Sequence, residues 1–154
     1  MMTPELSIFS IRDLSVTFQT RDGPVEAVKS ASLDVGAGET LAIVGESGSG
    51  KSQLMMAAMG LLAQNGYTKG SATYKGEELL GLSKAALNRI RGRKITMIFQ
   101  EPMTSLDPLY TIGSQLTEPI RHHQGISSKA AEARALELLR LVKIPEPERR
   151  LRSY

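Results

Sequence analysis

The chain has 154 residues, of which 41% are hydrophobic and 23% charged, a composition typical of globular proteins. It contains no cysteine, which excludes a disulfide framework and a thiolate metal site and fits a reducing compartment. The formal net charge of +3 is unevenly placed, because residues 121–154 carry eight Lys and Arg against four Asp and Glu. No RNA-binding signature or aromatic interleaving accompanies them, so we interpret this segment as a solvated face, with nucleic acid or anionic lipid as alternative partners.

The sequence lacks the patterns of secretion and of membrane insertion. The N-terminal residues MMTPELSIFSIRDL have no basic flank that leads into an apolar core. The longest apolar run is well short of the roughly 20 residues that cross a bilayer. We therefore expect any membrane role to go through a partner.

The first third of the chain predicts β structure. Apolar side chains recur there at a period of two, as in half-buried strands. They are Leu14, Val16 and Phe18 in one run and Ala31, Leu33 and Val35 in the next. The segment TRDGPVE between the runs predicts a long hairpin loop, and GAGE at residues 36–39 predicts a tight turn.

Two short apolar segments predict strands that are buried on both faces of a parallel sheet, namely residues 40–44 and residues 95–99. Between them, apolar residues at helical spacing predict a helix that stops at Asn65-Gly66. Those residues are Leu54, Ala58, Leu61 and Leu62. The segment GSATYKGEEL predicts a short strand and a turn.

The remainder of the chain predicts helices. Ile112, Leu116 and Ile120 form one stripe, in which Pro119 favours a kink or a break. Ser127 is a candidate cap for an amphipathic helix that Pro145 and Pro147 end. We expect its inner face to consist of Ala131, Ala135, Leu138, Leu139 and Val142. The order of elements indicates an α/β architecture with a helical appendix.

The sequence GESGSGKS matches the phosphate-loop pattern G-x-x-x-x-G-K-[ST] and lies between a predicted strand and a predicted helix. Its residues are Gly45, Glu46, Ser47, Gly48, Ser49, Gly50, Lys51 and Ser52. Glycines let successive backbone amides face a polyphosphate, and the start of the helix adds its free amides and its dipole. Lys51 is then expected at the β- and γ-phosphates, and the Ser52 hydroxyl on Mg²⁺. The alternative, a Gly- and Ser-rich linker, does not explain this context.

Two further stretches narrow the choice among phosphate-loop proteins. ITMIFQEPMTSLDPLYTIGSQLTEPIRHHQG places Gln100 after an apolar segment, and VTFQTRDGPVEAVKSASLDVGAGETLAIVGESGSGKS places an aromatic residue ahead of the loop. With these motifs, essentially the whole chain resembles the ATP-binding subunits of ABC transporters. The subgroup it resembles most powers importers of di- and oligopeptides or nickel.

The resemblance implies a P-loop NTPase fold of ABC type. We expect an antiparallel β subdomain in residues 1–39, a P-loop core with a partial parallel sheet in residues 40–100, and a partial helical subdomain in residues 101–154. Residues 45–52 would be the Walker A loop, which binds ATP with Mg²⁺. Gln100 would be the Q-loop glutamine, which contacts Mg²⁺ or the attacking water and acts with Lys51 in catalysis. Phe18 would stack on adenine, or else be a core residue of its strand.

The resemblance also implies partners. These are transmembrane permease subunits, contacted by residues 101–112, and a second nucleotide-binding subunit in a homo- or heterodimer. The chain would be peripheral on the cytoplasmic face of the inner membrane, bound to it only through partners and without nucleic acid. The transported substrate does not follow from this sequence.

Other residues are assigned structural roles. His122 and His123 are adjacent, so on a helix they point about 100° apart, and we interpret them as surface or cap residues rather than metal ligands. Met55, Met56 and Met59 are expected to pack under the sheet. RIRGRK at residues 89–94 is interpreted as a solvated turn, with a nucleic-acid patch as the alternative.

Three motifs of the family do not occur in these 154 residues, namely the L-S-G-G signature, the Walker B aspartate with its catalytic glutamate, and the switch histidine. We therefore expect the N-terminal half of a nucleotide-binding domain, whose hydrolysis of ATP by itself is slower by orders of magnitude. Two alternatives stay open. One is a non-catalytic pseudo-ATPase or fragment that binds nucleotide and docks on membrane subunits, and the other is an ABC-type DNA-repair ATPase.

Overall fold

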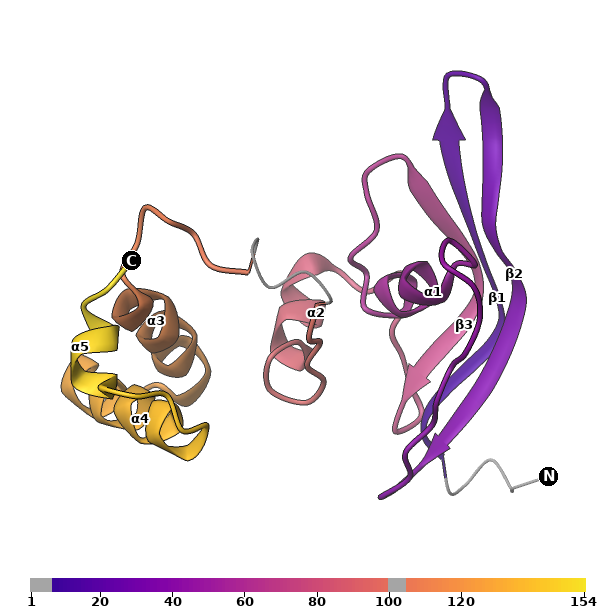
Figure 1. Cartoon of the computed structure of the whole chain (residues 1–154). Helices are drawn as coiled ribbons and strands as arrows, with labels where there is room; N and C mark the ends of the chain where they lie inside the picture. The colour runs from indigo at the N-terminus through magenta and orange to yellow at the C-terminus, as the bar shows by residue number, and fades with distance from the viewer. Residues whose placement is uncertain (1–6, 100–104) are drawn as a thin grey trace. The chain divides into compact units, whose positions relative to one another are not determined.

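The computed structural model describes residues 7–99 and 105–154 and divides into two compact units, residues 1–88 and 89–154 (Figure 1). The first unit contains strands β1 (Ser7–Thr20), β2 (Gly23–Gly36), β3 (Gly66–Tyr74) and β4 (Glu77–Glu78) and helix α1 (Lys51–Ala58). Helix α2 (Lys84–Ile90) crosses the boundary between the units. The second unit contains helices α3 (Ile112–Gln124), α4 (Ser128–Leu141) and α5 (Pro147–Leu151).

The strands of the first unit form one antiparallel sheet in the order β2-β1-β3-β4. The predicted strands in the first third are thereby confirmed. The predicted long hairpin loop is wrong, because β1 and β2 pair up to Thr20 and Gly23 and leave a turn of only Arg21 and Asp22. The Thr20 hydroxyl donates to the Gly23 carbonyl at 2.7 Å and closes this turn.

The core of the first unit lies between this sheet and α1. Ile11, Leu14 and Val16 of β1 are fully buried and are the largest side chains at the centre. Leu54, Ala57 and Ala58 bring one side of α1 onto them, and Val28 and Ala72 complete the cluster. Met59 is also buried and Met55 packs against the cluster, as predicted for these methionines. Burial of such side chains is the main term that holds the helix on the sheet.

Helix α1 ends earlier than the sequence pattern predicts. Gly60, at φ +62°, follows the helix, and its amide donates to the Ala57 carbonyl at 3.0 Å while that of Leu61 donates to Met56 at 2.8 Å. This pair of bonds is the Schellman arrangement that stops a helix at a glycine. Asn65 instead ties the start of β3 to β1, because its side-chain amide donates to the Gln19 carbonyl at 2.8 Å.

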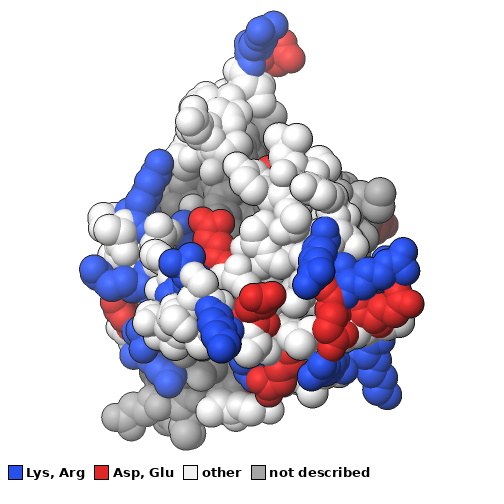
Figure 2. All heavy atoms as spheres, turned by 90° about the vertical axis from the view of Figure 1, so that its left-hand side faces the viewer, with Lys and Arg blue, Asp and Glu red and all other residues white. Residues whose placement is uncertain are grey.

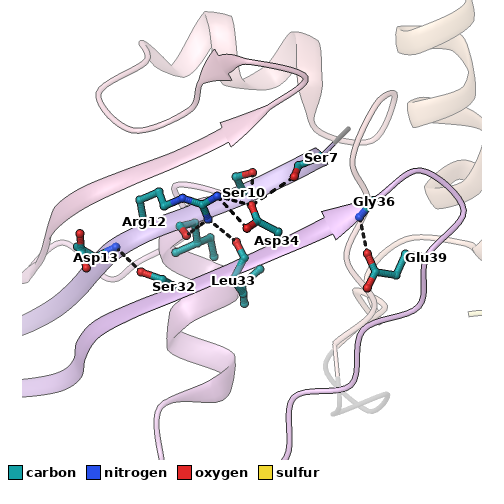
Figure 3. Close-up of polar contacts among 10 residues, drawn as sticks. Ser7, Ser10, Arg12, Asp13, Ser32, Leu33, Asp34, Gly36 and Glu39 are labelled. Atoms are coloured by element: carbon teal, nitrogen blue, oxygen red, sulfur yellow. Dashed lines mark hydrogen bonds and ion pairs between the residues drawn. The ribbon is translucent and has the colours of Figure 1, made fainter. Parts of the chain in front are cut away.

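A polar network links β1 to β2 near the start of β1 and the end of β2 (Figure 3). The Arg12 guanidinium donates to both Asp34 carboxylate oxygens, at 2.6 and 2.8 Å, and the Ser10 hydroxyl donates to the same carboxylate at 2.7 Å. The Arg12 and Ser10 hydrogen bonds lower the pKa of Asp34 below its ordinary value. These bonds fix the pairing of the two strands beside an irregular part of β1, residues 11–14.

Strand β1 carries an extra residue between Ile11 and Leu14, where the pairing with β2 and with β3 shifts. Asp13 takes φ +47° there, and its amide donates to the Ser32 hydroxyl at 2.9 Å. Gly70 of β3 passes directly over the bulge, so a Cβ at this position would lie 2.5 Å from the Asp13 carbonyl oxygen. The bulge therefore requires a glycine on the neighbouring strand.

The two predicted parallel strands are wrong. Residues 40–44 and 95–99 contain no strand, and Val44 and Ile98 are 88% and 97% exposed. A parallel strand needs hydrogen-bonded neighbours, and the described ranges 7–99 and 105–154 provide none for either segment beyond an isolated bridge between Arg91 and Ile95. The short strand and turn over GSATYKGEEL are confirmed as β3, its turn and β4.

In the second unit, α3, α4 and α5 pack against one another. Small residues make the close contacts, since Ala131 and Ala135 are fully buried and a Cβ on Gly113 would lie 2.6 Å from the Leu151 carbonyl oxygen. The predicted cap is confirmed, because the Ser127 hydroxyl accepts from the Ala130 amide at 3.3 Å. Val142, predicted on the inner face, is instead 64% exposed because α4 ends at Leu141.

Helix α3 runs through Pro119, so the predicted break does not occur, and a kink at this residue stays a prediction. Thr111 caps its first turn, with its hydroxyl accepting from the Ser114 amide at 3.2 Å. Among the helices of the described residues, none is long and apolar enough to cross a membrane.

Replacing Gly70 with alanine is expected to destabilise the first unit by about 2–4 kcal/mol, because the new methyl group collides with the β1 bulge at a strained positive φ. Gly76→Ala is the matched control, since Gly76 also has a positive φ, +80°, but nothing lies within 4 Å of its Cβ position. We expect it to cost only about 1 kcal/mol. Chemical denaturation measures the free energy of unfolding of both variants, and equal losses of stability would contradict this account of Gly70.

Candidate nucleotide-binding site

The phosphate-loop sequence leads directly into α1, as predicted. Gly50 precedes the helix at φ 91° and ψ 0°, and its carbonyl accepts the first helical hydrogen bond, from the Leu54 amide at 2.9 Å. No side chain of the described residues caps this end. The amides of the first turn therefore point out of the helix toward the loop, together with the positive end of its dipole.

Lys51 holds the loop together from within. Its ammonium donates to the Gly45 carbonyl at 2.8 Å, to the Glu46 carbonyl at 2.6 Å and to the Ser49 hydroxyl at 3.2 Å. These contacts use all three donors of the ammonium, so residues 45–49 curl around one positive charge. Gly48, at φ +81°, and the bond from the Ser49 amide to the Glu46 carbonyl at 3.2 Å form the turn.

Gly50 fixes the loop against the edge strand β2. A Cβ on Gly50 would collide with the Ala27 carbonyl oxygen and lie 3.1 Å from a methyl group of Val28. The positive φ and the close approach both require glycine, so the sequence pattern has a steric cause at this position. The contact places the start of α1 beside β2.

An open groove of about 500 Å³ runs between β2 and the loop. It is lined by residues 26–29 and 31 of β2, by residues 43–45 and 49–51, and by Leu54 of α1. Its volume lies within the range of small-molecule sites. The ammonium of Lys51 and the dipole of α1 make the loop side favourable for an anion.

Phe18, the candidate for adenine stacking, does not line this groove. Its ring packs against the core cluster and against Gly66, where a Cβ would lie 2.8 Å from the Phe18 ring. This placement favours the alternative interpretation of Phe18 as a core residue. Its contact with adenine stays a prediction.

Gln100 and residues 101–104 lie outside the described residues, so the Q-loop prediction has no structural counterpart here. In the rest of the predicted partner-facing segment, Leu109 and Tyr110 are 80% and 59% exposed. The Gln115 side chain organises this segment, accepting from the Asp107 amide at 2.8 Å and donating to the Asp107 and Tyr110 carbonyls at 2.8 and 2.9 Å. Sequence reasoning missed Gln115, because a glutamine in a helix gives no local signal of such contacts.

Figure 2 shows Lys and Arg side chains intermixed with Asp and Glu over the lower half of this face, below an area formed mostly by other residues. This mixture fits the interpretation of the basic C-terminal excess as a solvated surface. The rings of His122 and His123 meet edge to face with centroids 5.1 Å apart. Within the described residues, no group of His, Asp and Glu is arranged to hold a metal ion.

Comparison with known proteins agrees with this geometry. The family model described as ABC transporter matches residues 28–154. The oligopeptide transport ATP-binding protein OppD of Escherichia coli is 48% identical over 148 residues, covering 96% of this chain and 44% of OppD. The dipeptide transport ATP-binding protein DppD of Lactococcus lactis is 45% identical over 152 residues, covering 97% of this chain and 44% of DppD.

Among solved structures, the ATP-binding cassette MJ0796, a dimer bound to ADP and Pi, superposes with a TM-score of 0.79. It is 25% identical, and the match covers 94% of this chain and 60% of that one. The predicted fold class, a P-loop fold of ABC type, is confirmed by this similarity. The chain spans less than half the length of the curated peptide-transport relatives quoted above. From the match of the family model over most of its length, the chain belongs to the ABC transporter family.

Proposed function

We propose that this chain binds ATP with Mg²⁺ through residues 45–52 and serves as the ATP-binding motor subunit of a peptide importer. The observation that carries the proposal is the contact of Gly50 with β2, which sets the amides of α1 and the Lys51 ammonium beside one groove. A polyphosphate needs donors and positive charge at short range, and both are present here.

The residues fit the proposed ligand in detail. The loop amides and Lys51 would hold the phosphates, whose oxygens would replace the three loop oxygens as acceptors of the Lys51 ammonium. The Ser52 hydroxyl at the exposed start of α1 would ligate Mg²⁺, which lowers the repulsion between phosphate oxygens when bound. We propose that Gln100 contacts Mg²⁺ or the attacking water, and that Phe18 stacks on adenine.

Hydrolysis of ATP and its coupling to peptide import are proposals as well. They rest on the family and on relatives that are named as oligopeptide and dipeptide transport proteins. The proposed partners are transmembrane permease subunits and a second nucleotide-binding subunit, on the cytoplasmic face of the inner membrane. We propose that residues 1–39, 40–100 and 101–154 correspond to the β subdomain, the P-loop core and part of the helical subdomain.

Lys51→Ala is expected to weaken ATP binding at least about tenfold, because the loop loses the ammonium that bonds to its carbonyl groups. Isothermal titration with ATP in the presence of Mg²⁺ measures the affinity. Lys69→Ala, which removes an exposed lysine of β3, is the control and should keep wild-type affinity. Equal affinities of the two variants would contradict the assignment of this loop.

Leu109→Glu is expected to reduce co-purification with the permease subunits of a peptide importer several-fold, because it charges an apolar side chain that is 80% exposed in the partner-facing segment. Leu141→Glu is the matched control, since Leu141 is 74% exposed at the end of α4. If both variants co-purified as well as the unmodified chain, this segment would not be the docking surface.

A further inference from the structure

The groove beside the phosphate loop has a second charged rim that the phosphate-loop motif does not include. Glu26 and Lys29 of β2 also line the groove, and the Lys29 ammonium lies 3.8 Å from the Glu26 carboxylate. Both side chains are solvent-accessible, with 47% and 77% of their surface exposed. They are therefore free to contact a ligand in the groove.

A bulge in β2 brings these two residues together. Val16 pairs with Val28 but Thr17 pairs with Glu26, so Ala27 is an extra residue that has no partner on β1. Side chains of a regular strand alternate, and residues three apart face opposite sides. A second register shift follows at once, because two β2 residues, Lys29 and Ser30, lie opposite the single β1 residue Ser15. These irregularities break the alternation, and the ion pair shows that Glu26 and Lys29 lie on one side.

The same bulge is the point where the strand meets the loop. The Ala27 carbonyl oxygen lies so close to Gly50 that a Cβ there would collide with it. Glu26 therefore sits next to the start of α1 along the groove, and not at a remote part of the sheet. Bulges often re-aim side chains next to functional sites.

We propose that Glu26, oriented by Lys29, binds the ribose hydroxyls of the nucleotide whose phosphates the loop holds. This inference rests on the proposed function and adds a residue for recognition of the nucleoside part. A carboxylate only accepts hydrogen bonds and repels phosphate, whereas the ribose offers two neutral hydroxyl donors. Ribose is joined directly to the phosphates of a nucleotide, and Glu26 lines the same groove as the phosphate loop.

The test compares wild-type protein and Glu26→Ala, each with ATP and with a nucleotide that lacks the ribose hydroxyls. Affinities are measured by isothermal titration in the presence of Mg²⁺. Wild-type protein should bind ATP about three- to tenfold more tightly than 2′,3′-dideoxy-ATP, the effect of one or two hydrogen bonds. Glu26→Ala should bind the two nucleotides about equally. Its affinity for tripolyphosphate, which has no ribose, should not fall.

Glu77→Gln is the control, because Glu77 is an exposed acidic residue of β4 away from the groove. It should keep the wild-type ratio of affinities, and circular dichroism confirms that each variant is folded. A wild-type ratio in Glu26→Ala would overturn the role of Glu26, and so would a loss of tripolyphosphate affinity equal to the loss for ATP. If the wild-type chain bound neither ATP nor tripolyphosphate, the proposed function would fail first and this role with it.

Discussion

The close approach of Gly50 to the Ala27 carbonyl is the contact on which the site depends. The loop has no side chain at the point of contact, and the facing residue of β2, Ala27, has no partner on β1. From it follow the position of the first turn of α1, the groove beside β2 and the distance of Glu26 from the loop. Hydrophobic packing of Leu54, Ala57 and Ala58 on β1 then keeps the helix in this place.

Charge in the loop is arranged by the backbone rather than by acidic side chains. Lys51 is satisfied by two carbonyl oxygens and one hydroxyl, none of which carries a formal charge. A carboxylate partner would neutralise the ammonium, whereas carbonyl groups leave its charge available to an anion. The loop therefore combines an ordered backbone with an ammonium that forms no ion pair among the described residues, an arrangement that suits a phosphate site.

Local patterns predicted this structure well, and patterns that depend on distant neighbours predicted it poorly. The alternating residues of β1, the phosphate loop and the Ser127 cap each involve residues close in sequence, and all three were predicted. Residues 40–44 and 95–99 have the composition of buried strands, but a strand forms only where another one pairs with it. The end of α1 was also predicted too late in the sequence, because the helix stops at Gly60 and not at Asn65.

The pairing register of the β-strands could not be predicted from the sequence. The bulges at Asp13 and Ala27 arise from the pairing of whole strands, and a single sequence does not reveal which residue is left unpaired. Glu26 therefore gave no signal as a site residue, although it lines the same groove as Lys51. Phe18 did give a signal in the sequence, but the signal had two meanings, because an aromatic residue can stack on a ligand or pack in a hydrophobic core.

The central claim, that this loop and this edge of β2 form one nucleotide site, is tested most directly by backbone amide chemical shifts measured by NMR as ATP and Mg²⁺ are added. The account predicts that the largest changes fall on residues 45–53 and on residues 26–29, with little change in α4. Changes confined to other parts of the chain, or no changes at millimolar ATP, would contradict it.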